Sequence, residues 1–200
     1  YEGVKLANKL YPEVLGKKVE LVVADNKSDK VEAANAATVL AQKEKVNAVL
    51  GSWGSSLSMA GGPIFAEAKI PAVAISATNP NVTKGNEYYF RVAFLDSFQG
   101  TAGAAYALDT LKAKKVAIIR EVSNDYSVGL AKFFVDHFVK ATGDANAVVA
   151  TADYNTGDQD FTAQLTNIKT ANPDVIFAPG NYTESALIIK QARALGITAP

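Results

Sequence analysis

The sequence predicts an α/β protein whose strands form largely parallel sheets in two lobes. Apolar runs of strand length alternate with stretches of helical period of roughly 10–15 residues, which is typical of βαβ units. The strand-length runs are continuously apolar, which favours sheets covered on both faces. A polar segment near Asp96 separates two series of these units.

The first half of the chain supplies four expected strands, at residues 19–24, 46–50, 72–75 and 88–94. Helices are expected at residues 2–10, 29–45 and 55–69. The third helix contains Gly61, Gly62 and Pro63, which we expect to bend or interrupt it.

The second half repeats the pattern, with strands expected at residues 115–119, 147–152 and 175–178. The matching helices are expected at residues 98–111, 127–141, 161–170 and 184–195. We place the boundary near Asp96, with a first lobe at residues 1–95 and a second at residues 96–200. Because a doubly wound lobe has about five or more strands and each half supplies about four, we expect both lobes to be incomplete.

Composition excludes several classes of function. The 200 residues include 20 basic and 20 acidic side chains, so charge gives no reason to expect nucleic acid or an anionic membrane as partner. The absence of cysteine excludes disulfides, thiolate metal sites and cysteine nucleophiles. No apolar run reaches the length of about 18 residues that a membrane span needs. The chain opens at Tyr1 within an expected helix, so we expect that a leader or an upstream segment precedes it in a longer precursor.

Two first-lobe loops follow neighbouring expected strands and are rich in small hydroxyl residues. Residues 51–56 lead into a helix that starts near Ser55, where a hydroxyl and free N–H groups are able to hold a carboxylate or phosphate. An ordinary helix-capping serine is the alternative interpretation. Residues 75–80 form the second loop, which contributes Thr78. Because the carboxyl ends of successive parallel strands lie side by side, we expect the two loops to meet.

Aromatic side chains also fall at strand exits. Tyr126 and Tyr182 each lie among polar neighbours after a second-lobe strand, and such amphipathic side chains commonly wall small-molecule sites. Trp53, the only tryptophan, lies on the first of the hydroxyl-rich loops. A ligand contact and a packed core position are both open for it.

Catalytic and metal-binding patterns are missing. The sequence has no G-x-G-x-x-G, no Walker loop and no G-x-S-x-G motif. The single histidine, His137, falls inside an expected helix, and one histidine without cysteine cannot anchor a zinc site. Asp25, Glu121, Asp158 and Asp160 are expected to be solvated. We therefore predict no catalytic activity, no cofactor and no metal.

Six segments, in order, carry a likeness to a known family: VNAVLGSWGSSLS, IPAVAISATNP, FRVAFLDSFQG, DYSVGLAKFF, GDQDFTAQL and ALIIKQARALGI. Together they resemble the type I periplasmic binding proteins, and within these the leucine/isoleucine/valine-binding branch that serves ABC importers. The resemblance covers nearly the whole chain. It implies two Rossmann-like lobes closing on a small ligand, a membrane permease as partner and a periplasmic or extracellular location. Lipid anchoring of the full precursor is left open.

The resemblance also implies roles for particular residues. Ser55 matches the serine that grips the ligand carboxylate, and Tyr126 matches an aromatic residue that packs on the ligand after closure. The position of Asn181 is commonly a tyrosine in the family, and the neighbouring Tyr182 replaces it only if the loop shifts. The candidate ligand-binding residues are Trp53, Ser55, Ser56, Ser76, Ala77, Thr78, Tyr126, Asn181 and Tyr182.

The family pattern also contains a first strand before residue 2 and a continuation past Pro200, with an acidic residue for the ligand ammonium. Neither is present, so we expect a fragment of that pattern. The leading hypothesis is capture of an amino acid, or of a similar small carboxylate or amide, by hinge closure between the lobes. The alternatives are a sensing domain of the same fold, a truncated or engineered scaffold without ligand, and a Rossmann-like enzyme.

Overall fold

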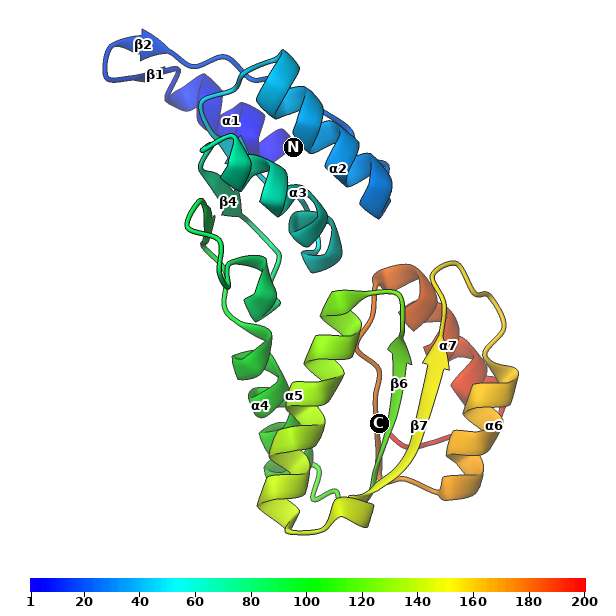
Figure 1. Cartoon of the computed structure of the whole chain (residues 1–200). Coiled ribbons are helices and arrows are strands. Elements are labelled where there is room, and N and C mark those ends of the chain that lie inside the picture. Colours follow the sequence, from blue (N-terminus) through cyan, green and yellow to red (C-terminus); the bar gives the residue numbers. More distant parts are fainter.

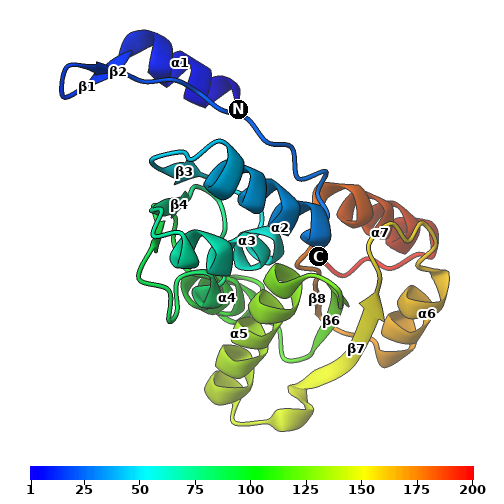
Figure 2. The same ribbon diagram turned by 45° about the horizontal axis from the view of Figure 1, so that its top comes forward.

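The computed structural model describes residues 1–200 and begins with a segment that stands apart from the rest (Figure 2). Helix α1 (Glu2–Leu10) has no buried residue, and it is followed by the short antiparallel hairpin of β1 (Glu13–Val14) and β2 (Lys17–Lys18). The strand predicted at residues 19–24 is wrong, because this stretch pairs with no other strand. A β-strand needs a neighbour to satisfy its backbone N–H and C=O groups, and none lies beside it here.

The first lobe contains a three-stranded parallel sheet in the order β3-β4-β5. Its strands are β3 (Val49–Leu50), β4 (Ala72–Ala74) and β5 (Tyr89–Arg91). Helix α2 (Lys30–Thr38), continued by the π-helical turn η1 (Val39–Lys43), packs with α3 (Ser55–Glu67) against the sheet (Figure 1). Helix α3 runs through Pro63 without interruption.

The two faces of this sheet differ in burial. Val49, Ala72 and Tyr89 are paired in register and are buried under the helices. Leu50 and Phe90 belong to the next row across the strands, and both are more than half exposed. The expectation of a sheet covered on both faces is therefore wrong for the first lobe, since α2 and α3 cover only one face.

The second lobe follows the predicted pattern on both faces. Its parallel sheet has the order β7-β6-β8, with β6 (Val116–Glu121) between β7 (Val148–Tyr154) and β8 (Val175–Phe177). Val116 and Ile118 of β6 pack in one buried cluster, and Ala117 and Ile119 pack in another on the opposite face. This alternation between two cores explains why the strand is continuously apolar.

Four helices cover the two faces of this sheet. Helix α4 (Asp96–Ala105), its continuation η3 (Tyr106–Thr110) and α5 (Asp125–Thr142) share the first cluster, whereas α6 (Thr162–Ala171) and α7 (Tyr182–Ala194) share the second. Short 3₁₀ turns, η2 (Pro80–Val82) and η4 (Ala145–Ala147), complete the chain. No helix combines the length and the hydropathy that crossing a bilayer requires.

The chain passes once between the two groups of elements, through residues 92–95 between β5 and α4. The buried cluster before this crossover runs from Ala37 to Tyr89, and those after it begin at Ala104. We keep the division at Asp96 as a proposal and refer to the two parts as the first and second lobes.

Candidate functional site

The hydroxyl-rich loop after β3 leads directly into α3. Gly54, at a φ of 88°, is the N-cap of this helix, so the capping-serine interpretation of Ser55 is wrong. Ser55 is the first helical residue, is only 1% exposed, and its Oγ accepts a hydrogen bond from the backbone N–H of Asn79 at 3.1 Å. The loops after β3 and β4 therefore do meet. A serine oxygen that accepts one hydrogen bond keeps its own proton to donate.

Trp53 lies on the same loop and is 56% exposed. The core interpretation of this side chain is therefore wrong. The loop behind it is held by Tyr89, whose hydroxyl donates to the carbonyl of Gly51 at 2.8 Å. Burial raises the pKa of Tyr89, so this phenol stays a donor at physiological pH.

The loop after β4 places its members in different surroundings. Ala77 is fully buried in the first-lobe core, and Thr78 is 7% exposed. Arg91 donates to the backbone carbonyls of Thr78 and Asn79 at 3.0 and 2.9 Å, which fixes the course of the loop. The buried hydroxyl of Ser76 has no hydrogen-bond partner.

Tyr126 lies in the first turn of α5, at the exit of β6. Its backbone N–H is bound by the N-cap residue Asn124, and its hydroxyl accepts a hydrogen bond from Gln99 of α4 at 3.3 Å. Burial raises the pKa of this phenol, so it remains protonated near neutral pH. The side chain is half-buried, with its hydroxyl against α4.

Asn181 and Tyr182 lie at the start of α7. Asn181 is the N-cap residue, but its side chain makes no capping hydrogen bond. Tyr182 is 81% exposed, so most of its ring faces solvent. The structure therefore brings Ser55 against the loop that carries Ser76 and Thr78, and it leaves Tyr182 apart from them.

Ser56 is engaged across the lobes. Its Oγ donates to the carboxylate of Asp125 in α5 at 2.7 Å and accepts from the backbone N–H of the same residue at 2.9 Å. Because a serine hydroxyl has a single proton to donate, this contact leaves Ser56 no donor for a ligand carboxylate.

Glu121 corrects another prediction, since it was expected to be solvated and is 2% exposed. Its carboxylate accepts hydrogen bonds from the side chains of Asn124, at 2.9 Å, and Thr156. The nearby Glu184, also buried, accepts from the backbone N–H of Gly157 at 3.0 Å. The two carboxylates join the loops after β6, β7 and β8. Burial and the charges of Glu121 and Glu184 raise the pKa of the Tyr154 phenol beside them.

The sequence marked Asp96, the first residue of α4, only as the boundary between the lobes and gave its side chain no role. It is fully buried, and neither carboxylate oxygen has a hydrogen-bond partner. Burial raises the pKa of Asp96, and the neighbouring Thr78 side chain and Arg91 charge offset part of that rise. No sequence signal marks this burial, because an aspartate that opens a helix is usually solvated.

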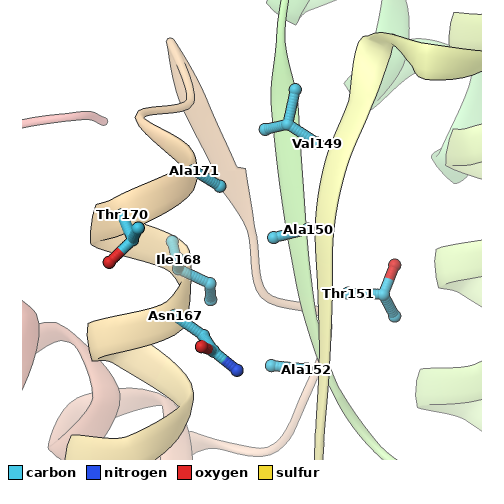
Figure 3. Close-up of a pocket in the computed structure, with 8 residues that line it drawn as sticks. All are labelled: Val149, Ala150, Thr151, Ala152, Asn167, Ile168, Thr170 and Ala171. Atoms are coloured by element: carbon cyan, nitrogen blue, oxygen red, sulfur yellow. The ribbon is translucent and has the colours of Figure 1, made fainter.

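His137 is half-buried in the middle of α5. Histidine and carboxylate side chains do not gather in the groups of three or more that hold a metal ion. A pocket of about 350 Å³ lies between β7 and α6. Figure 3 shows the residues that line it: Val149, Ala150, Thr151, Ala152, Asn167, Ile168, Thr170 and Ala171. It lies along the middle of β7 and includes none of the candidate ligand-binding residues.

Comparison with known proteins identifies the family to which the chain is similar. A family model described as "Periplasmic binding protein" matches residues 2–200. The chain is 32% identical over 185 residues to an amino acid binding protein of Pseudomonas aeruginosa, covering 92% of this chain and 48% of that protein. It is 31% identical to the leucine-specific-binding protein of Salmonella typhimurium, covering 92% of this chain and 49% of that protein.

Two solved structures extend the comparison. A leucine binding protein of Thermotoga maritima superposes with a TM-score of 0.94 at 45% identity, over 99% of this chain and 55% of that one. A branched-chain amino acid transporter substrate binding protein of Streptococcus pneumoniae, in complex with isoleucine, superposes with a TM-score of 0.86 at 37% identity, over 97% and 54%. The chain thus spans about half the length of the relatives it matches.

Proposed function

Since the chain belongs to the periplasmic binding protein family, whose members are transport receptors and not enzymes, we propose that it captures an amino acid between its two lobes. A branched-chain amino acid is the first candidate. The relatives include a leucine-specific-binding protein and a protein solved with isoleucine.

The observation that carries this proposal is the state of the Ser55 hydroxyl. It is fixed by the N–H of Asn79 but keeps its own proton, at the N-terminus of the 13-residue helix α3. Free N–H groups and the positive end of a helix favour a carboxylate at such a position. Ser55 therefore binds the ligand carboxylate, while the unpaired hydroxyl of Ser76 and the Thr78 loop contact its polar groups.

The second lobe contributes the closing side. Tyr126 packs on the ligand side chain, and Asn181 at the start of α7 closes over it by rotation about the crossover at residues 92–95. Trp53, exposed at the edge of the first lobe, contacts the apolar part of the ligand. Tyr182 reaches the ligand only after a shift of its loop. Ser56 is no longer among the proposed ligand-binding residues, because its hydroxyl donates its proton to the Asp125 carboxylate.

The wider role follows from the family. We propose that the protein is the solute-binding component of an ABC importer, located outside the cytoplasmic membrane, and that its ligand-bound form docks on a membrane permease.

A thermal-shift screen of the 200-residue chain against leucine, isoleucine, valine and the other common amino acids tests ligand capture. A ligand present at about 100 times its dissociation constant adds about 2.7 kcal/mol to the stability of the folded state. We expect a shift with at least one branched-chain amino acid, absent with its amide and lost in Ser55→Ala. A folded chain that shifts with none of them contradicts the proposal and favours a scaffold without ligand.

A further inference from the structure

The first turn of α5 reaches across from the second lobe and contacts three separate elements of the first. Asp125 opens this helix, and its carboxylate lies 2.7 Å from Ser56 Oγ in α3 and 3.1 Å from Lys30 Nζ in α2. Its backbone carbonyl accepts a hydrogen bond from Asn79 Nδ2, beside η2, at 2.8 Å. One residue of the second lobe is thus bound by three residues of the first.

The contact between Asp125 and Ser56 is reciprocal. The serine hydroxyl donates to the Asp125 carboxylate, and its oxygen accepts the Asp125 backbone N–H at 2.9 Å. Breaking it therefore removes two hydrogen bonds at once, one of which involves a charged group and is correspondingly strong. Burial alone would raise the pKa of Asp125, but hydrogen bonds from Ser56 and Lys30, together with the lysine charge, outweigh it and lower the pKa.

The backbone of α5 is shaped for this approach. A Cβ atom on Gly129, one turn further along the helix, would lie 2.7 Å from Asn79 Nδ2. Glycine at this position therefore lets the helix lie close to the Asn79 side chain without displacing it. Asn79 in turn is held from behind by Arg91, which donates to its carbonyl at 2.9 Å.

We propose that Asp125, with Ser56, Lys30 and Asn79, forms a latch that sets the orientation of the two lobes. Residues 92–95 connect the two lobes covalently, and the contacts at Asp125 join them at a second place. Every side-chain hydrogen bond or ion pair between residues 1–95 and the elements after α4 involves Asp125.

The latch has a consequence for ligand capture. Ser56 adjoins Ser55, and Asp125 adjoins Tyr126, so the latch holds the two proposed ligand-binding residues on opposite sides of one interface. Asp125, Lys30 and Ser56 are therefore positioning residues that pre-organise the site. Only this consequence rests on the proposed function; the latch itself does not need a ligand.

The test measures the lobe orientation without ligand. Because the chain has no cysteine, Lys43→Cys in η1 and Lys190→Cys in α7, both exposed, accept one spin label each. Double electron–electron resonance then gives the distribution of distances between the lobes. We expect one dominant distance in the labelled parent chain. In Asp125→Asn we expect about a tenfold rise in the ratio of displaced to latched lobes, equivalent to about 1.4 kcal/mol.

Matched variants separate the latch from a general effect on α5 or on folding. Glu32→Gln also neutralises a carboxylate in the first turn of a helix, but its lysine partner, Lys27 at 3.6 Å, lies in the same lobe, so the distances should stay unchanged. Lys30→Glu should broaden the distribution, and adding Asp125→Lys should narrow it again by restoring an ion pair of reversed sign. Circular dichroism confirms that each variant is folded.

The outcomes are distinct. Broadening in Asp125→Asn and in Ser56→Ala, with a smaller combined effect than the sum of the two, supports the latch. An unchanged distribution in folded Asp125→Asn, additive single effects, or equal broadening in Glu32→Gln overturns it. None of these results depends on whether an amino acid binds, so the ligand screen and the latch fail independently.

Discussion

The Oγ of Ser55 accepts a hydrogen bond from the backbone N–H of Asn79 at 3.1 Å, in a position where both residues are almost fully buried. This single bond ties the loop after β3 to the loop after β4. It also leaves the serine its own proton to donate. Ser56, one residue later, donates its hydroxyl proton in a hydrogen bond to the Asp125 carboxylate. Two adjacent serines thus have different chemistry.

Replacing Ser55 tests the structural half of this arrangement. Ser55→Ala leaves the buried N–H of Asn79 without its acceptor, which costs about 1–3 kcal/mol in the free energy of unfolding. Urea denaturation followed by circular dichroism measures this loss. Ser28→Ala, at an exposed position, is the control and should change stability by less than about 0.5 kcal/mol. Equal stability of Ser55→Ala and the parent chain would show that the bond is not made in solution.

Glu121 gives a second prediction. In Glu121→Ala the side chains of Asn124 and Thr156 lose a buried acceptor, so we expect a loss of about 1–3 kcal/mol in the free energy of unfolding. Glu121→Gln keeps one acceptor oxygen and should lose less. Chemical denaturation of both variants, beside the exposed control Glu87→Ala, checks the order of the effects. A larger loss in Glu87→Ala than in Glu121→Ala would contradict the burial of this carboxylate.

Two glycines of α4 should respond in opposite directions. A Cβ on Gly100 would lie 2.7 Å from the backbone nitrogen of Phe134 in α5, so Gly100→Ala forces the two helices apart. We expect a loss of about 1–3 kcal/mol. A Cβ on Gly103 meets Phe134 and Phe177 at 3.5 Å, an ordinary contact, so Gly103→Ala should keep or raise stability by up to about 1 kcal/mol. Thermal denaturation of the two variants and the parent chain measures both changes in stability. Equal effects at both positions would refute the close approach of α4 and α5.

The burial of Asp96 should make the stability of the folded chain depend on pH. Burial raises the pKa of Asp96 in the folded state, so between its unfolded value of about 3.9 and its folded value the native chain holds the proton more tightly. Stability from this group is therefore lost as the pH rises through that window. Asp96→Asn removes the effect, so its stability relative to the parent chain should improve as the pH rises through that window and stay level above it.

Urea titrations of the parent chain and Asp96→Asn at a series of pH values measure this difference. Asp109→Asn, an exposed substitution, serves as the control and should run parallel to the parent. A difference between Asp96→Asn and the parent that stays constant with pH would mean that the carboxylate is not buried as described.

Much of the fold was readable from the pattern of apolar residues. The apolar run at residues 115–119 correctly predicts β6. Its alternate side chains pack into two cores, and both cores are formed by residues of the same half of the chain. The run at residues 19–24 is also rich in apolar residues, yet it forms no strand. Its apolar side chains favour a strand, but a strand also needs a neighbouring strand to bind its backbone N–H and C=O groups. The apolar pattern does not show whether such a neighbour is present.

The candidate site shows the same division. Sequence alone determined that hydroxyl-rich loops follow β3 and β4, and that they meet at one edge of a parallel sheet, because that follows from the direction of the strands. Only the tertiary structure decided that Ser56 binds Asp125, a residue 69 positions away, and that Glu121 and Asp96 are buried. A periodic pattern reports which side chains avoid water within one element. The partner that satisfies a particular proton or charge depends on how separate elements are placed in space, and no local pattern encodes that.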